Sequence, residues 1–310
     1  MRHIATTIKK FLPISYKDSI DILKKTFLHM DTKFSLENMF FQDFVEIYGL
    51  DNFNVSMDAL ASFTIGSSSE FAIRQFILKY PDETMNQMLV WAKDVNQHLR
   101  RLASEGSRPR LPWAIALPLF KKNPNKVLKI LEILKDDNSK YVQKSVANNL
   151  NDISKDNPNI VKELTKRWIN KTTNRDWILK HGCRTLLKNS DKETLAFFGL
   201  VENKNLYLDN FHCTKNVSNK DVLDFSFLLT SKKEFGKLRI EYAIDFLRKN
   251  EKYNTKVFKI SEATYKTTSK NVSKTYSFKP ISTRKYYKGL HYISIIINGV
   301  VLKKESFTLN

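Results

Sequence analysis

The chain has 310 residues, of which 42% are hydrophobic, and its 52 Lys and Arg against 32 Asp and Glu give a formal net charge of +20. This length suits two domains of about 100–200 residues each, and the apolar content excludes a chain that is disordered throughout. Two cysteines exclude a disulfide framework, and no apolar run approaches a membrane span. The charge favours a polyanionic partner, nucleic acid before an anionic membrane, although a Lys-rich composition alone would also produce it.

The first two thirds of the chain, residues 1–205, are predicted to form a helical domain. Apolar residues recur at spacings of three and four, as in Val127, Ile130 and Leu134. Prolines flanked by Asn or Asp, such as Pro158, mark breaks between these segments.

Three segments in this part align without gaps, namely 98–106, 141–149 and 177–185, at offsets of 43 and 36 residues. Equivalent apolar positions carry Leu99, Val142 and Ile178, and equivalent small or β-branched positions carry Ala103, Val146 and Gly182. Helical pairs that repeat at about 40 residues are typical of a HEAT-like solenoid, in which the second helix of each pair usually lines the concave surface.

The repeat also predicts a cationic surface that contains carboxylates. Equivalent positions carry Arg101, Lys144 and Lys180, and four residues later on the same helical face come Glu105, Asn148 and Arg184. Asp152 follows one turn after Asn148. Cations suit a groove that follows DNA phosphates, but carboxylates inside it would repel that backbone. Glu105 and Asp152 therefore either stabilise a developing positive charge in catalysis or pair with neighbouring Arg and Lys side chains.

The segment after Glu105, GSRPRLPWA at 106–114, is predicted to leave the helix along a fixed extended path. Arg108 and Arg110 would then be able to reach phosphates, and Trp113 could offer a flat apolar face to a sugar. The alternative is a rigid loop between two repeats, with Trp113 packed into the core.

After residue 220 the apolar pattern changes to alternation, which predicts strands at 223–229, 237–244, 256–260, 274–281 and 291–297. Asn298-Gly299 is a strong signal for a two-residue hairpin turn. We expect a small all-β immunoglobulin-like sandwich over 220–310, after an Asn-rich linker at 202–220. This domain holds 19 Lys and Arg against 8 Asp and Glu, a net charge of +11, which leaves +9 for residues 1–219.

The run LRRLASEGSRPRLPWA (99–114) resembles the hallmark of the AlkC family of DNA alkylation repair glycosylases. VQKSVANNLNDISKDNP (142–158) and WILKHGCRTLLKNSD (177–191) are similar to later repeats of that family, and the resemblance covers roughly residues 36–200. It implies a mostly α fold, a HEAT-like helical-repeat solenoid shared with the AlkD proteins. A subset of AlkC-like proteins carries a C-terminal immunoglobulin-like domain, which the β-rich tail matches by pattern.

The resemblance implies a monofunctional DNA glycosylase of base excision repair that hydrolyses the N-glycosidic bond of alkylated bases without full base flipping. It points to 3-methyladenine first, with 3-methylcytosine and 1-methyladenine as further substrates. An alkylated base leaves as a neutral group, so the barrier lies in the oxocarbenium-like sugar, which a carboxylate can stabilise. Glu105 is the first candidate, Asp152 the second and Trp113 the nearest aromatic, whereas Trp168 and Trp177 are expected in the core. The alternative is a non-catalytic HEAT-repeat protein that binds damaged or branched DNA.

The expected partner is double-stranded DNA that contains alkylated bases. The side chains expected to contact it are Arg101, Arg108, Arg110, Lys144, Asn148, Lys180, His181 and Arg184. For His181, burial in the core explains the position equally well. The sequence has neither phosphate-binding glycine motifs nor metal-ligand spacing among its histidines, so we expect no nucleotide cofactor and no metal. The start of the chain does not resemble a signal peptide, so we expect the protein in the bacterial cytoplasm. We further expect it to be a monomer and to associate with the nucleoid.

Overall fold

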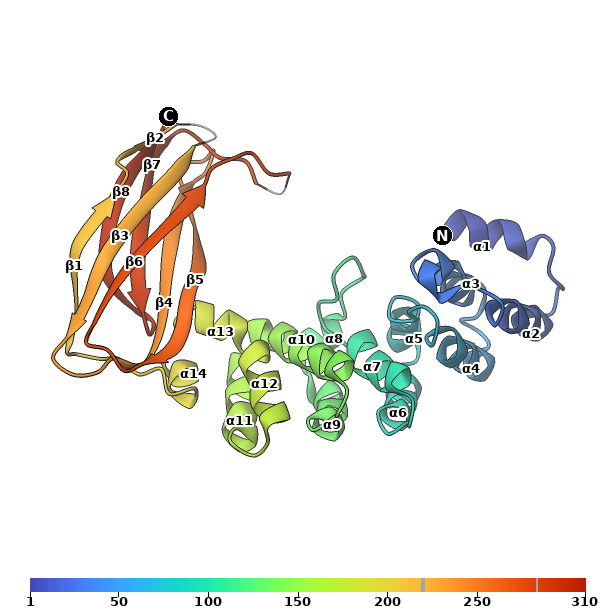
Figure 1. Ribbon diagram of the computed structural model, residues 1–310. Coiled ribbons are helices and arrows are strands. Elements are labelled where there is room, and N and C mark those ends of the chain that lie inside the picture. The colour runs from blue at the N-terminus through green and yellow to red at the C-terminus, as the bar shows by residue number, and fades with distance from the viewer. Residues whose placement is uncertain (219–220, 283) are drawn as a thin grey trace. The chain divides into compact units, whose positions relative to one another are not determined.

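The computed structural model describes residues 1–218, 221–282 and 284–310 (Figure 1). The chain divides into two compact units, Met1–Thr185 and Leu186–Asn310. Residue 220, at which the sequence predicts the β domain to begin, lies outside the described residues. None of the helices in these ranges is both long and apolar enough to cross a bilayer.

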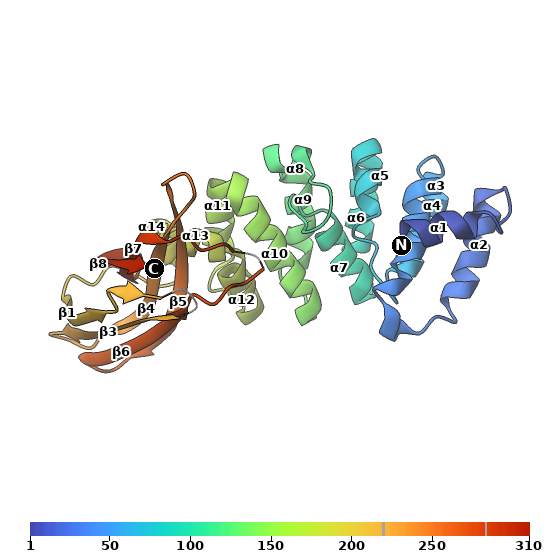
Figure 2. The same cartoon turned by 90° about the horizontal axis from the view of Figure 1, so that it is seen from above.

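The first unit is a stack of α-helices, seen from above in Figure 2. They are α1 (Arg2–Lys9), α2 (Tyr16–Phe27), α3 (Phe40–Tyr48), α4 (Phe53–Phe63), α5 (Ile73–Lys79), α6 (Pro81–Trp91), α7 (Gln97–Gly106), α8 (Pro118–Lys122), α9 (Asn125–Leu134), α10 (Lys140–Asp156), α11 (Pro158–Trp168) and α12 (Thr173–Gly182). Two short 3-10 turns, η1 (Thr32–Phe34) and η2 (Glu37–Met39), precede α3. The next helix, α13 (Arg184–Lys188), spans the boundary between the units, and α14 (Lys192–Phe197) belongs to the second unit.

The helix boundaries follow from the residues that the sequence analysis marks as breaks. Pro81 and Pro158 occupy the first turns of α6 and α11, where a missing backbone N–H costs no hydrogen bond. Asn96 caps α7, because its side-chain oxygen accepts a hydrogen bond from the backbone N–H of His98 at 2.9 Å. Thr172 caps α12 in the same way.

The three predicted repeat segments lie in α7, α10 and α12, and α10 packs between the other two. Gly182, at the end of α12, allows this close approach: a Cβ there would lie 3.0 Å from the Cβ of Leu150 and 3.3 Å from the carbonyl oxygen of Ala147. The helices α6, α9 and α11 form a second row beside them (Figure 1). The helical-repeat prediction is therefore confirmed.

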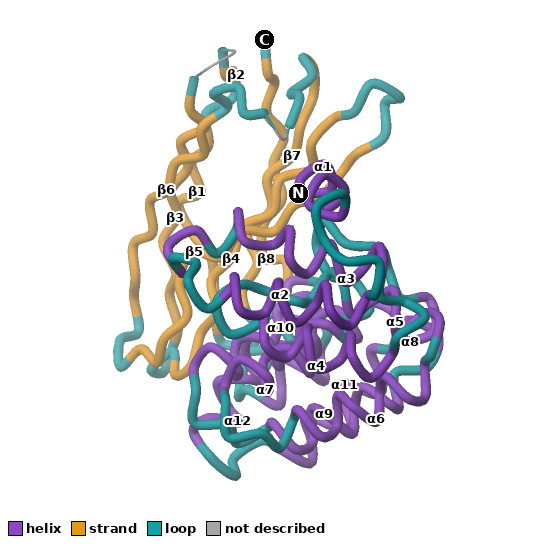
Figure 3. Tube along the Cα trace, turned by 90° about the vertical axis from the view of Figure 1, so that its right-hand side faces the viewer, coloured by secondary structure: helices purple, strands orange, loops and turns teal. Residues whose placement is uncertain are grey.

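After α14, the second unit contains two β-sheets, whose strands are orange in Figure 3. The strands are β1 (Leu206–Cys213), β2 (Asn216–Val217), β3 (Val222–Ser231), β4 (Gly236–Leu247), β5 (Tyr253–Tyr265), β6 (Ser269–Ser277), β7 (Gly289–Ile297) and β8 (Val300–Leu309). Within the described residues, one sheet has the order β1-β3-β6 and the other the order β2-β8-β7-β4-β5. All pairs are antiparallel except β2 with β8.

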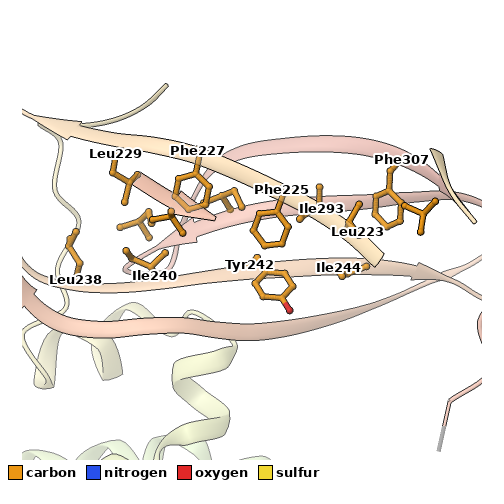
Figure 4. Close-up of a cluster of buried hydrophobic side chains, with 14 of the residues drawn as sticks. Leu223, Phe225, Phe227, Leu229, Leu238, Ile240, Tyr242, Ile244, Ile293 and Phe307 are labelled. Carbon is orange, nitrogen blue, oxygen red and sulfur yellow. The ribbon is translucent and has the colours of Figure 1, made fainter. Parts of the chain in front are cut away.

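The core of the second unit lies between these two sheets (Figure 4). Alternate residues of β3 point into it, namely Leu223, Phe225, Phe227 and Leu229. They meet Leu238, Ile240, Tyr242 and Ile244 of β4 together with Ile293 of β7 and Phe307 of β8. This alternation of buried and exposed positions is the pattern that predicts the strands from the sequence.

Most strand predictions are confirmed, since 223–229, 237–244, 256–260 and 291–297 all lie within strands. The segment 274–281 is a strand only as far as Ser277. Asn298 and Gly299 form the predicted turn, with positive φ angles of 47° and 81° that suit a two-residue hairpin.

The linker prediction for 202–220 is wrong, because β1 and β2 lie within that range. β1 pairs with β3 from Leu206 onward. It is an edge strand with few buried side chains, so its polar sequence hides the strand pattern.

Candidate functional site

The two carboxylates that the repeat predicts on one surface are brought together by a single guanidinium. Glu105 lies in the last turn of α7 and Asp152 lies in α10, with side chains only 7% and 2% exposed. Arg108 Nη1 donates to Glu105 Oε1 at 2.6 Å, and Arg108 Nε donates to Asp152 Oδ2 at 2.8 Å. These three residues are called the carboxylate cluster below.

The remaining carboxylate oxygens of the cluster also have donors. Ser145 Oγ donates to Glu105 Oε2 at 2.6 Å, and Lys155 Nζ donates to Asp152 Oδ1 at 3.0 Å. Burial alone would lower the pKa of Arg108, but Glu105 and Asp152 raise it overall, so the guanidinium stays charged. The ion pairing that the non-catalytic explanation requires is therefore present. It also holds two carboxylate groups at a buried position beside the cationic face, where the catalytic explanation requires one.

Arg101 is held beside the cluster by Glu70, with which it forms a close ion pair. Its guanidinium also donates to Ser68 Oγ at 2.8 Å and lies 5.2 Å from the ring centre of Tyr141. The side chain is 16% exposed. Arg101 thus lies on the predicted face but is occupied by protein partners.

The loop after α7 places its side chains very differently. Arg108 turns inward to the cluster, whereas Arg110 is exposed and forms a bidentate pair with Asp156 at 2.7 and 2.6 Å. Trp113 has a left-handed φ of 62° and is 99% exposed. A side chain exposed to that degree packs neither into the core nor against Glu105.

The face continues on α12 with an aromatic pair, of which one member is exposed and the other partly exposed. Trp177 is 39% exposed, contrary to the predicted core position, and its ring stacks on His181 at 5.4 Å between centroids. Trp168, in contrast, is buried as predicted. Burial lowers the pKa of His181, and the nearby Arg184 and Lys144 lower it further, so the imidazole is neutral at pH 7.

Four polar positions complete this face on α10, α12 and α13. Arg184 Nη2 donates to Asn148 Oδ1 at 3.1 Å, which confirms that the two helices bring these residues together. Burial lowers the pKa of Arg184, and Asp152 opposes that shift, so the carboxylate cluster lies within electrostatic reach. Lys144 is exposed and Lys180 partly exposed.

Sequence reasoning missed Ser145 and Arg74. Ser145 is buried and occupies one oxygen of Glu105. Arg74 is wholly buried on α5 and donates to three main-chain carbonyls, one at the last residue of α7 and two in the segment that follows it. The one signal in the sequence is an Arg between the apolar residues of FAIRQFILK at 71–79. Among the described residues, no group of three or more His, Cys, Asp or Glu is arranged to hold a metal.

Comparison with known proteins gives matches over both units. Residues 63–205 match the family described as "DNA alkylation repair enzyme", and residues 208–310 match the "C-terminal Ig-like domain" family of the protein YhaZ. YhaZ of Bacillus subtilis (strain 168) is 44% identical over 309 residues, which are 99% of this chain and 85% of that protein. The structure of Pseudomonas fluorescens alkylpurine DNA glycosylase AlkC, bound to DNA containing an abasic site analog, is similar with a TM-score of 0.94. It is 33% identical and covers 99% of this chain and 86% of that one.

Proposed function

The chain belongs to the AlkC family of DNA alkylation repair enzymes, with a C-terminal immunoglobulin-like domain, and from this we propose that it is a monofunctional DNA glycosylase. Its reaction is hydrolysis of the N-glycosidic bond of alkylated bases in double-stranded DNA, without full base flipping. The proposed substrates are 3-methyladenine first, then 3-methylcytosine and 1-methyladenine. The helical repeats are proposed to be HEAT-like, and the protein to act as a monomer in the cytoplasm, at the nucleoid.

The observation that carries this proposal is the buried carboxylate of Glu105, held by Arg108 and Ser145 on a surface rich in cations. As the cationic base departs, positive charge develops on the sugar ring. A carboxylate that is shielded from water stabilises such charge strongly, because the local dielectric constant is low. Glu105 is the proposed catalytic carboxylate, Asp152 supports it through Arg108, and Trp113 is the proposed aromatic contact to DNA.

The proposed DNA contacts differ in how readily they can meet a phosphate. Lys144 and Arg110 are exposed, and His181 is partly exposed. Arg108 is buried between two carboxylates, so its proposed role is to hold the cluster. The remaining proposed contacts are Arg101, Asn148, Lys180 and Arg184.

The immunoglobulin-like domain is proposed to add to DNA binding through its net charge of +11. At one end of the domain, a surface pocket of about 410 Å³ supports this proposal. Its cationic lining residues are Arg248, Lys249, Arg284 and Lys285, and none of its lining residues is acidic. Cations gathered in this way suit the phosphodiester backbone.

The alternative is a non-catalytic protein that binds damaged or branched DNA. It is favoured by one observation, the neutralisation of Glu105 by Arg108.

Incubation with duplex DNA treated with a methylating agent, followed by chromatography of free bases, separates the two functions. A glycosylase releases 3-methyladenine and leaves abasic sites. Binding of the methylated duplex without any released base would establish the alternative and refute the proposed activity.

A further inference from the structure

The buried guanidinium of Arg74 forms hydrogen bonds with the main chain at both ends of the segment that follows α7. Arg74, on α5, is 0% exposed. Its Nη1 donates to the carbonyl oxygens of Gly106 at 3.0 Å and Arg108 at 2.8 Å, on the outgoing limb of the segment. Its Nε donates to the carbonyl oxygen of Ile115 at 2.7 Å, on the returning limb. The segment between these carbonyls carries Arg110 and Trp113.

The surroundings of Arg74 are unusual for a buried Arg. Such side chains are normally paired with a carboxylate, yet in the described part of the chain no carboxylate lies within ion-pair distance of Arg74. Burial and the neighbouring charge of Arg108 lower the pKa of Arg74 to about 10. An apolar side chain would fill the same space without this desolvation.

Instead of a carboxylate, the guanidinium of Arg74 contacts the C-terminal end of α7. The last carbonyls of a helix have no partner within the helix and carry partial negative charge, so a cation there is favourable. Gly106 is the last residue of α7, and a Cβ at that position would lie 2.7 Å from Ile73, the residue next to Arg74. The C-terminal end of α7 therefore packs closely against Arg74 and its neighbour Ile73.

We propose that Arg74 is a positioning residue, which fixes the main chain of Arg108 so that its side chain bridges Glu105 and Asp152, and which sets the direction of Trp113. The main-chain carbonyl of Arg108 accepts from Arg74 while its side chain holds both carboxylates. This inference rests on the proposed glycosylase function, because the carboxylate cluster is the site that Arg74 positions.

The test uses the full-length variant Arg74→Lys, which keeps the charge but cannot span both limbs with one ammonium group. We expect the single-turnover rate of base release at saturating protein to fall about 10- to 100-fold, since small displacements of catalytic groups have effects of this size. The affinity for duplex DNA should change less than about threefold. Trypsin should cut the Arg110–Leu111 bond of the folded variant faster than that of the wild type.

Arg100→Lys is the control at the other end of α7, where Arg100 donates to the loop carbonyls of Asp94 at 3.0 Å and Val95 at 2.8 Å but also pairs with the carboxylate of Asp137. This control should lose stability without faster cutting at Arg110 and without loss of rate. Wild-type rate and cutting in Arg74→Lys would overturn the inference, and so would a loss of rate no greater than that of Arg100→Lys. Absence of base release by the wild type would refute the glycosylase function, whereas the trypsin comparison would still report on the loop.

Discussion

Ion pairing divides the cations of the repeat face into those that a phosphate can reach and those that it cannot. Arg101 and Arg108 are held by carboxylates with little exposure, so a phosphate would have to displace Glu70 or Glu105. Lys144 is exposed and makes no ion pair with any residue in the described ranges. Arg110 is intermediate, because it is exposed but paired.

Asp156→Asn should strengthen DNA binding, because it releases Arg110 from its bidentate pair and removes a negative charge. Exposed pairs of this kind contribute about 0.2–1 kcal/mol, so we expect an affinity increase of about 1.4- to fivefold. Fluorescence anisotropy with a labelled duplex measures it. Asp136→Asn is the matched control, since Asp136 forms the equivalent bidentate pair with Arg175. Equal gains from both variants would contradict a specific contact of Arg110 with DNA.

The same variant has a pH signature. The hydrogen bond from Arg110 lowers the pKa of Asp156. The pair therefore stabilises the fold at pH values above the ordinary carboxyl pKa, and this stabilisation is lost as the pH falls through the lowered value. As the pH falls from the ordinary carboxyl pKa to the lowered pKa of Asp156, Asp156→Asn should therefore lose less stability than the wild type. Thermal unfolding at a series of pH values measures this difference.

The sequence predicts which side chains share this face, but not which of them form ion pairs within the protein. Helical periodicity is local, so the alignment of Arg101 with Lys144 follows from spacing alone. Arg101 meets Glu70 across 31 positions, and Arg108 meets Asp152 across 44. Pairings at such separations depend on how the helices pack, and no short sequence motif predicts them.

At the scale of elements, the position of α12 on α10 depends on the missing side chain of Gly182. The equivalent positions on α7 and α10 carry Ala103 and Val146, so of these three positions the one at this crossing has no side chain, and a Cβ there would make tight contacts.

Gly182→Ala should destabilise the protein by about 1–3 kcal/mol, the usual range for overpacking, although Ala is the better helix former. Urea unfolding measures the free energy change. Because α12 carries Lys180 and His181, DNA affinity should fall as well. Unchanged or increased stability would contradict the close approach of the two helices.

Helices and central strands were predictable because their patterns are local and complete. Pro158 marks a helix start, and Leu223 to Leu229 alternate as a strand with one buried face must. β1 was not predicted, because an edge strand buries few side chains and its sequence therefore lacks the alternating pattern. Arg74 escaped because its partners are main-chain carbonyls, which any residue can supply.

At the scale of the whole molecule, the net charge of +20 is shared between two domains, with +11 on residues 220–310. The sequence alone does not say whether this excess is spread evenly or gathered. Arg248 and Lys249 follow β4 at one end, beside Arg284 and Lys285, and line a pocket. Lys232 and Lys233 precede β4 at the opposite end.

The double variant Arg248→Glu/Lys249→Glu should weaken binding of duplex DNA and flatten its dependence on salt concentration. Loss of two phosphate contacts lowers the slope of log affinity against log salt by about 2. The matched control is Lys232→Glu/Lys233→Glu, which changes the net charge equally at a distance of about 40 Å along the strand. Equal effects of the two variants would mean that only overall charge matters and would contradict a DNA contact at the pocket.

The proposed activity depends above all on the buried carboxylate of Glu105, which is proposed to stabilise the cationic sugar. Single-turnover release of 3-methyladenine from methylated duplex DNA tests it directly, with wild type, Glu105→Gln and the control Glu132→Gln, whose carboxylate also accepts a side-chain hydrogen bond, from Trp168. We expect a rate about 100-fold or more lower for Glu105→Gln, with DNA affinity retained, and a wild-type rate for Glu132→Gln. Release by Glu105→Gln at the wild-type rate would contradict this role.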